Sequence, residues 1–253
     1  MKFGLIGHPI AHSLSPVLFK AGYDGRYPYE LIETADFEEA YQRFLDGYDG
    51  INVTAPFKEL ACAKADILSE ECKAIGATNL LIKTAEGVKA YNSDYLGVRM
   101  WLQESISAAA DRKISVLIVG MGGAGKAAAA AAESLGMKVT RMNRTVRDEM
   151  TRPLEDFREC FREHDIIIYN IPAAIPALEE LTEEDFIPGR VKHILEANYR
   201  NPSFDEDLLS RLEGAGSSVR YTGGRIWLLY QALTGYEIFT GEKPDLGKMS
   251  DVL

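Results

Sequence analysis

Ile114-Ser-Val-Leu-Ile-Val119 runs directly into Gly120-Met-Gly-Gly-Ala-Gly125, and a block of alanines follows. A short β-branched run that ends at glycines spaced G-x-G-x-x-G, with a strong helix former behind it, is typical of a dinucleotide-binding β-α-β unit. The glycines permit a tight turn, a close approach of the pyrophosphate and close packing of the helix on the sheet. The helix N-terminus would offer N–H groups to the phosphates. We therefore predict a nucleotide site at Gly120, Gly122, Gly123, Ala124 and Gly125.

The residues after the next apolar segment, Met137–Met142, indicate which nucleotide this site would bind. An NAD site usually has Asp or Glu about 20 residues after the glycines, where the acid accepts from the ribose 2′-hydroxyl. The chain has no acid at 141–147. It offers instead three guanidinium groups and two small polar side chains, from Arg141, Arg144, Arg147, Asn143 and Thr145. Because arginine binds phosphate in a bidentate manner, the pattern favours NADP(H) over NAD(H). A solvent-exposed turn is the alternative for Arg141 and Arg147.

Composition excludes several classes of function. A length of 253 residues suits one large or two small domains, and 46% apolar with 26% charged residues is ordinary for a globular protein. The net charge of −10 argues against nucleic acid and against anionic membranes as partners. The sequence shows neither a membrane-length apolar run nor the apolar core of a signal peptide. Its three cysteines and four histidines lack the spacing of a metal site, so we expect reduced thiols, no metal and a cytoplasmic location.

Alternation of short apolar runs with helical stretches predicts an α/β protein of two domains. The expected strands are 2–6, 29–32, 50–53, 77–82, 88–90, 114–119, 137–142, 165–169, 193–195 and 218–221. The expected helices are 15–22, 37–45, 57–63, 69–75, 95–110 and 225–239, besides the alanine-rich one. We predict an N-terminal α/β substrate-binding domain of residues 1–98 plus 226–253, and a Rossmann-type dinucleotide-binding domain of residues 99–225.

Four polar clusters follow apolar runs in the N-terminal third. They are His12–Pro16, Gly50–Lys58, Gly76–Leu80 and Ala90–Tyr95. A helix cap before Pro16 would account for Ser15, but it leaves Ser13 unexplained. Taken singly, Lys58 suits a solvated surface, Asn79 a turn and Asp94 a helix cap.

Together the clusters resemble the shikimate dehydrogenase family, with its quinate/shikimate relatives, over almost the whole chain. The matching motifs are G-x-P-I-x-H-S-x-S-P at Gly7–Pro16, N-V-T-x-P-F-K at Asn52–Lys58, G-A-x-N at Gly76–Asn79, N-x-D at Asn92–Asp94, the glycine loop at 120–125, N-R-T at Asn143–Thr145, and Gln231. The first two motifs, in this order and spacing, are far more specific than the glycine loop.

The resemblance implies an enzyme of aromatic amino-acid biosynthesis that interconverts 3-dehydroshikimate and shikimate with NADP. Lys58 and Asp94 would be the catalytic pair, and Ser13 and Ser15 would hold the substrate carboxylate. The partners of the ring would be Thr54, Asn79, Asp94 and Gln231, with Tyr199 also on the substrate side. The cofactor would contact Gly120, Gly122, Gly123, Ala124, Gly125, Asn143, Arg144, Thr145 and Gly224.

The catalytic pair suits this chemistry. Reduction of a ketone needs a hydride on carbon and a proton on the new alkoxide. A lysine ammonium beside the carbonyl oxygen can polarise it and supply the proton. An aspartate can orient the lysine and accept from a neighbouring hydroxyl, and pairing of the two charges eases their burial.

The chain departs from the family pattern at three places. Residues 169–175 lack the usual Asn-Thr-Thr-Pro loop, Glu196-Ala-Asn-Tyr199 replaces D-x-x-Y, and Gly223–Trp227 replaces Asp-Gly…Met. These places would lie near the nicotinamide, so the substrate class is better supported than the cofactor geometry. A quinate or aminoshikimate dehydrogenase and a non-catalytic ligand-binding relative are the alternatives. We expect a small-molecule substrate and a monomer or homodimer.

Overall fold

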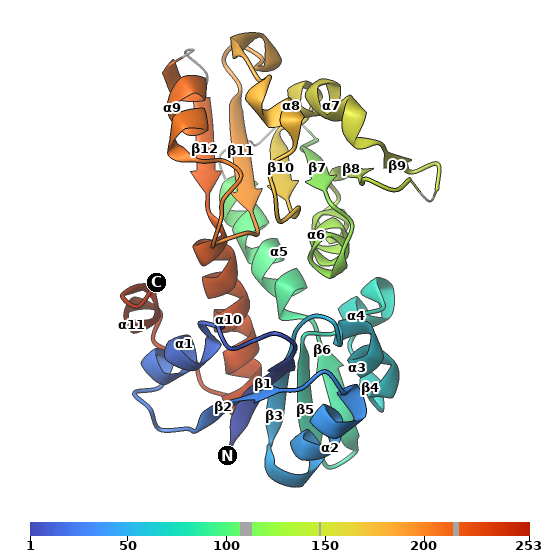
Figure 1. Cartoon of the computed structure of the whole chain (residues 1–253), viewed down its shortest axis with the longest axis vertical. Coiled ribbons are helices and arrows are strands. Elements are labelled where there is room, and N and C mark those ends of the chain that lie inside the picture. Colours follow the sequence, from blue (N-terminus) through green and yellow to red (C-terminus); the bar gives the residue numbers. More distant parts are fainter. Residues whose placement is uncertain (107–112, 147, 215–217) are drawn as a thin grey trace. The chain divides into compact units, whose positions relative to one another are not determined.

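The computed structural model describes residues 1–106, 113–146, 148–214 and 218–253 (Figure 1). The chain divides into two compact units, Met1–Gly97 with Leu229–Leu253 and Val98–Leu228. The boundaries fall within two helices, α5 (Ser93–Ile106) and α10 (Gly224–Thr240). Both units are α/β, which confirms the predicted fold class.

The first unit contains a six-stranded mixed sheet in the order β2-β1-β3-β5-β6-β4. Its strands are β1 (Phe3–Gly7), β2 (Tyr29–Glu33), β3 (Gly50–Val53), β4 (Ile67–Leu68), β5 (Leu80–Thr84) and β6 (Gly87–Tyr91). Its other helices are α1 (Ser15–Gly22), α2 (Phe37–Gly47), α3 (Lys58–Lys64), α4 (Glu70–Ile75) and α11 (Leu246–Ser250). The first three strands of the order are parallel, whereas β5 runs antiparallel to both β3 and β6.

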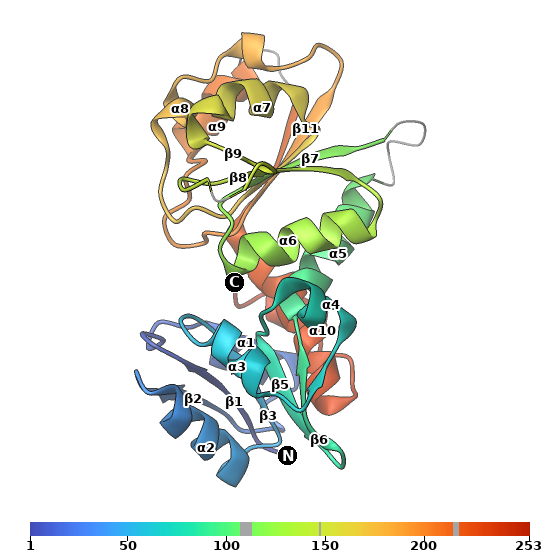
Figure 2. The same ribbon diagram turned by 90° about the vertical axis from the view of Figure 1, so that its right-hand side faces the viewer.

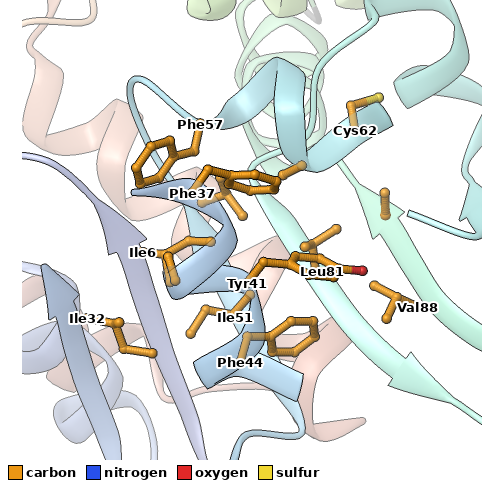
Figure 3. Packing of buried hydrophobic residues seen from close by; sticks show 14 of the residues in the cluster. Ile6, Ile32, Phe37, Tyr41, Phe44, Ile51, Phe57, Cys62, Leu81 and Val88 are labelled. Carbon is orange, nitrogen blue, oxygen red and sulfur yellow. The ribbon is translucent and has the colours of Figure 1, made fainter. Parts of the chain in front are cut away.

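Helix α2 shows how the sequence builds the core on one face of this sheet. The side chain of Asp36 accepts hydrogen bonds from the N–H groups of Glu38 and Glu39 and so caps the helix. The apolar residues Phe37, Ala40, Tyr41 and Phe44 follow at helical spacing and are buried. Figure 3 shows the resulting cluster, in which strand side chains such as Ile6 and Ile51 meet the rings of α2. This packing fixes β1 and β3. The carboxyl end of β1 leads to the His12–Pro16 cluster, and that of β3 leads to Lys58.

Aromatic residues fill the other side of the first unit. The ring centroid of Phe19 in α1 lies 4.7 Å from that of Tyr236 in α10, and Phe3 stacks on Phe239 at 4.9 Å. Aromatic pairs at these separations add stabilisation beyond the area that they bury. They hold α1 and the C-terminal half of α10 against the start of β1.

The second unit contains a six-stranded parallel sheet in the order β12-β11-β10-β7-β8-β9. Its strands are β7 (Ser115–Val119), β8 (Lys138–Met142), β9 (Thr151–Arg152), β10 (Ile166–Tyr169), β11 (Val191–Glu196) and β12 (Ser218–Thr222). Its other helices are α6 (Gly123–Ser134), α7 (Phe157–Glu163), α8 (Pro176–Glu179) and α9 (Glu206–Gly214) (Figure 2). The order is that of a dinucleotide-binding domain, with its switch point between β7 and β10.

Predicted and observed elements differ mainly at their ends. The predicted helix 95–110 corresponds to α5, which begins at Ser93, and residues 107–110 lie outside the described residues. The strand expected at 77–82 begins only at Leu80. The reason is a local turn at Thr78, whose hydroxyl donates to the carbonyl of Tyr91 at 2.6 Å and accepts from the N–H of Leu80 at 3.1 Å.

The second residue of strand β11 is an unusual buried lysine. Lys192 is 5% exposed, and its ammonium donates to the carbonyl oxygens of Phe161 and, at 2.7 Å, His164. The same nitrogen lies 4.4 Å from the centre of the Phe161 ring. Burial lowers the pKa of Lys192 to about 7.

This lysine should make stability depend on pH. An unfolded lysine titrates near pH 10.4, so between about pH 7 and 10 the unfolded state binds more protons than the native one. The free energy of unfolding should therefore rise through this range, by up to about 1.4 kcal/mol per pH unit from this residue. Urea unfolding of the wild type and of Lys192→Met at both ends of the range measures the effect. The wild type should gain stability relative to the variant, and parallel pH profiles would contradict the expectation.

Candidate active site

Lys58 and Asp94 form an ion pair in the first unit. The ammonium of Lys58, the first residue of α3, donates to Oδ2 of Asp94 at 2.5 Å. Phe57 anchors this helix start, because its ring is buried 5.5 Å from that of Phe37. The preceding turn is closed by the N–H of Phe57, which donates to the carbonyl of Thr54 at 3.0 Å. The folded core therefore fixes the base of the lysine side chain.

The two charges differ in their access to solvent. The side chain of Asp94 is 5% exposed, whereas that of Lys58 is 21% exposed. A buried carboxylate is costly without a charged partner, and the lysine is such a partner for Asp94. An ammonium carries three N–H donors and Asp94 takes one of them. The arrangement can therefore present an oriented, charged donor to a ligand oxygen.

Asn92 caps the helix that carries Asp94. Its Oδ1 accepts from the N–H of Tyr95 at 3.0 Å, and its Nδ2 donates to the carbonyl of Ala77 at 3.0 Å. The capping alternative for Asp94 is therefore wrong, because Asn92 does this and Asp94 binds Lys58. In the N-x-D motif the asparagine fixes the helix start, and the aspartate is left for the ion pair.

Asn79 is held by residues from two helices. Its Oδ1 accepts from the N–H of Ser93 at 2.7 Å, and its Nδ2 donates to Oγ of Ser93 at 3.0 Å. The same Nδ2 lies 3.4 Å from Oε1 of Gln231 in α10. The structure thus brings Asn79 and Gln231 together across 152 residues of sequence.

Ser13 and Ser15 form a second polar group in this unit. Their hydroxyls are 3.1 Å apart, and the N–H of Ser15 donates to Oγ of Ser13 at 3.2 Å. Ser15 is the first residue of α1, whose N-cap is Leu14, and no described side chain caps this helix. Capping therefore does not account for Ser15. The two adjacent hydroxyls can also donate to an anionic group of a ligand.

The glycine loop of the second unit fits a bound pyrophosphate. Gly120 has a φ of +91°, which favours glycine, and a Cβ on Gly125 would lie 1.9 Å from the carbonyl oxygen of Gly120. A Cβ on Gly122 would meet nothing within 4 Å, so its surroundings have room for a ligand. No described side chain caps α6, which begins at Gly123. The N–H groups of its first turn, from Gly123, Ala124 and Gly125, can bind phosphate.

The segment after β8 is tied to this loop. Asn143 accepts from the N–H of Met121 through Oδ1 at 3.4 Å and donates to the carbonyl of Thr145 at 3.2 Å. Arg144, between them, is exposed. Arg141 is paired with Glu133 of α6, so the structure favours the surface alternative for this residue. Arg147 lies outside the described residues.

Tyr199 belongs to the second unit, in contrast to the other predicted substrate residues, and Gly224, a predicted cofactor residue, belongs to the same unit. Tyr199 is half-buried in the loop that follows β11. A Cβ on Gly224 would lie 2.6 Å from the carbonyl oxygen of Ala197 and from the nitrogen of Tyr199. Close packing of the α10 start against this loop is therefore one reason for a glycine at 224.

Glu196 is a fully buried carboxylate whose role was not predicted from the sequence. It accepts from the N–H groups of Ser203 at 2.5 Å and Phe204 at 3.3 Å, and from the hydroxyl of Tyr221 at 2.8 Å. Burial, with the bond to Glu196, raises the pKa of Tyr221 well above its ordinary value. The carboxylate fixes both ends of the loop that carries Tyr199. The sequence signal for this role was an acidic residue at the end of an otherwise apolar strand.

The described residues were also searched for metal sites and for helices that could span a membrane. Among the described residues, no group of three or more His, Cys, Asp or Glu side chains could hold a metal ion. Within the same residues, every helix is too short or too polar to cross a membrane.

Comparison with known proteins places these features in a family. The model of the shikimate dehydrogenase substrate binding domain matches residues 5–81, and that of the D-isomer specific 2-hydroxyacid dehydrogenase NAD binding domain matches residues 78–187. A shikimate dehydrogenase (NADP(+)) of Natronomonas pharaonis is 31% identical over an alignment that covers 99% of this chain and 97% of the relative. The chain belongs to the shikimate dehydrogenase family. A shikimate dehydrogenase (NADP(+)) of Helicobacter pylori is 30% identical, over 100% of this chain and 97% of that enzyme.

Solved structures of shikimate dehydrogenases agree with this assignment. The enzyme of Thermus thermophilus, in complex with NADP(H) and shikimate, superposes with a TM-score of 0.77 at 26% identity over 100% of this chain and 98% of that one. A quinate dehydrogenase of Corynebacterium glutamicum in complex with NAD has a TM-score of 0.81 at 24% identity, over 100% of this chain and 98% of that one. At this identity the second likeness bears on the fold alone.

Proposed function

We propose that this protein is an NADP-dependent shikimate dehydrogenase that reversibly reduces 3-dehydroshikimate to shikimate. The observation that carries the proposal is the 2.5 Å ion pair of Lys58 and Asp94 in the unit that also holds the paired serines and the Asn79–Gln231 contact. These are the positions that the family resemblance assigns to the substrate. Membership of the family supports the same activity.

The chemistry follows from the donors and acceptors present. The Lys58 ammonium would donate to the carbonyl oxygen of the substrate and pass a proton to the alkoxide as it forms. Asp94 would orient this ammonium and accept from a neighbouring ring hydroxyl.

The hydroxyls of Ser13 and Ser15 would donate to the substrate carboxylate. The amides of Asn79 and Gln231, with Thr54, would bind ring hydroxyls, and Tyr199 is proposed as a further substrate contact.

The second unit would hold the cofactor, which supplies the hydride when bound. The N–H groups at the start of α6 would bind its pyrophosphate. Asn143, Arg144 and Thr145 would form the pocket for the adenosine 2′-phosphate, with Arg144 as its cation. Gly224 completes the proposed set of cofactor residues.

We further propose that the enzyme acts in the cytoplasm as a monomer or homodimer. Its cysteines Cys62, Cys72 and Cys160 are buried and free, as expected for a reducing compartment. Analytical ultracentrifugation distinguishes these two states from a larger assembly.

A panel of shikimate and quinate, each with NADP⁺ and NAD⁺, tests the proposed activity. The readout is the absorbance of the reduced nicotinamide. We expect kcat/KM to be highest for shikimate with NADP⁺, by about tenfold or more over each other combination, since one charged hydrogen bond is of this order. A preference for quinate would identify a paralogue. Inactivity with all four pairs would support a non-catalytic relative and contradict the proposal.

A further inference from the structure

Two helices of the first unit meet at a glycine. Gly97 lies in the second turn of α5, and a Cβ there would be 2.7 Å from the nitrogen of Gln231 and 2.9 Å from the carbonyl carbon of Tyr230. Both are backbone atoms of α10, so the clash could not be relieved by rotation of a side chain. Glycine inside a helix is unfavourable relative to alanine. The close approach of α10 explains why a glycine is present here.

A second glycine continues this contact on α10. Gly235 lies one helical turn after Gln231, and a Cβ there would be 3.1 Å from Oγ and 3.2 Å from Cβ of Ser93, the first residue of α5. It would also be 3.0 Å from Cδ1 of Leu80. The two helices therefore lie against each other over one turn, with a glycine from each at the contact (Figure 1).

The residues next to these glycines are those that hold Asn79. Ser93 of α5 exchanges two hydrogen bonds with the Asn79 amide, and Gln231 of α10 accepts a long one of 3.4 Å. Asn79 thus spans both helices at once. Asp94 is on the same turn of α5 as Ser93. The separation of the two helices sets the distances among the three side chains that we assign to the substrate ring.

We propose that Gly97 and Gly235 are positioning residues for recognition of the substrate's ring hydroxyls. They set the spacing of α5 and α10 at which Gln231 and Asn79 act on the same ligand. Ser13, in the segment before α1, and Lys58, in α3, lie outside this contact, although α1 packs on α10 through Phe19 and Lys58 pairs with Asp94 of α5. The response to a missing ring hydroxyl, rather than the rate alone, therefore identifies the proposed role. The inference rests on the proposed function and deepens it.

The test uses Gly97→Ala and Gly235→Ala, with Gly47→Ala as the matched control. Gly47 ends α2, and a Cβ there would meet nothing within 4 Å. Initial rates are measured for shikimate, for an analogue that lacks a non-reacting ring hydroxyl, and for NADP⁺. Gly97→Ala should raise the KM for shikimate about tenfold or more, since small misplacements are costly. The KM for NADP⁺ should stay within about twofold, since Gly97 belongs to the first unit and the proposed cofactor residues to the second.

The preference for shikimate over the hydroxyl-deficient analogue should shrink in Gly97→Ala, and less in Gly235→Ala, whose added methyl meets side-chain atoms. Gly47→Ala should behave as the wild type. If Gly97→Ala does not fold, Gly235→Ala is read by the same criteria. Unchanged preference in a folded variant, or equal losses for shikimate, analogue and NADP⁺, would overturn the inference. A wild type that is inactive with shikimate would instead overturn the proposed function.

Discussion

Lys58→Ala is expected to lower kcat with shikimate and NADP⁺ by a factor of about 10² to 10⁴, the usual contribution of a positioned acid or base. The KM for shikimate should change little, because the serines and amides that bind the substrate are untouched. The reason is that the ammonium, held 2.5 Å from Asp94, is the proposed proton donor to the reacting oxygen. Steady-state rates of NADPH formation measure both constants.

The chain offers a matched control on the same helix. Lys64 ends α3, is exposed and pairs with Glu38 at 2.8 Å, also on the surface. Lys64→Ala should retain the wild-type rate. Added methylamine should partly restore the rate of Lys58→Ala, since a small amine can take the place of the lost ammonium. Near-full activity of Lys58→Ala without amine would show that the assigned role is wrong.

Arg144→Ala is expected to raise the KM for NADP⁺ by about 10- to 100-fold, the range for loss of a hydrogen bond to a charged group. The KM for NAD⁺ should be almost unchanged, because NAD⁺ lacks the 2′-phosphate. Arg144 is exposed and follows Asn143, whose side chain binds the glycine loop. Kinetics with both cofactors at fixed salt concentration provide the measurement.

Arg141→Ala is the control for this second experiment. Arg141 is engaged by Glu133, so its loss should leave the ratio of the two KM values at the wild-type level. A cofactor preference that depends on Arg141 and not on Arg144 would place the 2′-phosphate elsewhere. It would also remove the support for the N-R-T segment as the adenosine pocket.

Local sequence signals predicted much of the fold. Gly50–Val53 and Ser15–Gly22 were predicted with the bounds observed, because the first is a short apolar strand and the second begins at Ser-Pro and ends at glycine. The glycine loop was predictable because its requirements are local: a positive φ at Gly120 and no room for a Cβ at Gly125. The comparisons with known proteins confirm the predicted fold class and the predicted family.

Other features depend on partners that are distant in sequence, which a local pattern does not contain. The pairing of Arg141 with Glu133 and the burial of Glu196 follow from packing in the second unit. Strands β4 and β9 have two residues each, too few for a period of two to appear. Helix α9 was not predicted, although Glu206 and Asp207 lie in its first turn, where the helix dipole favours acids.

The candidate site was predicted in part from its residues and in part from the family resemblance. A lysine, an aspartate and paired hydroxyls after apolar runs indicated a polar site, but their individual roles came from the resemblance. The contact of Asn79 with Gln231 could not be inferred from local patterns, because it requires the crossing of α5 and α10. The roles of these residues in catalysis and binding remain predictions.

A structure of the complex with shikimate would show whether Lys58 is placed to donate the proton. We expect Nζ of Lys58 to lie within about 3 Å of the ring oxygen that is oxidised, the usual hydrogen-bond distance, with Asp94 on the neighbouring hydroxyl and both serines on the carboxylate. A shikimate bound in the reverse orientation, with its carboxylate at Lys58, or a lysine directed into solvent away from the ring, would contradict it.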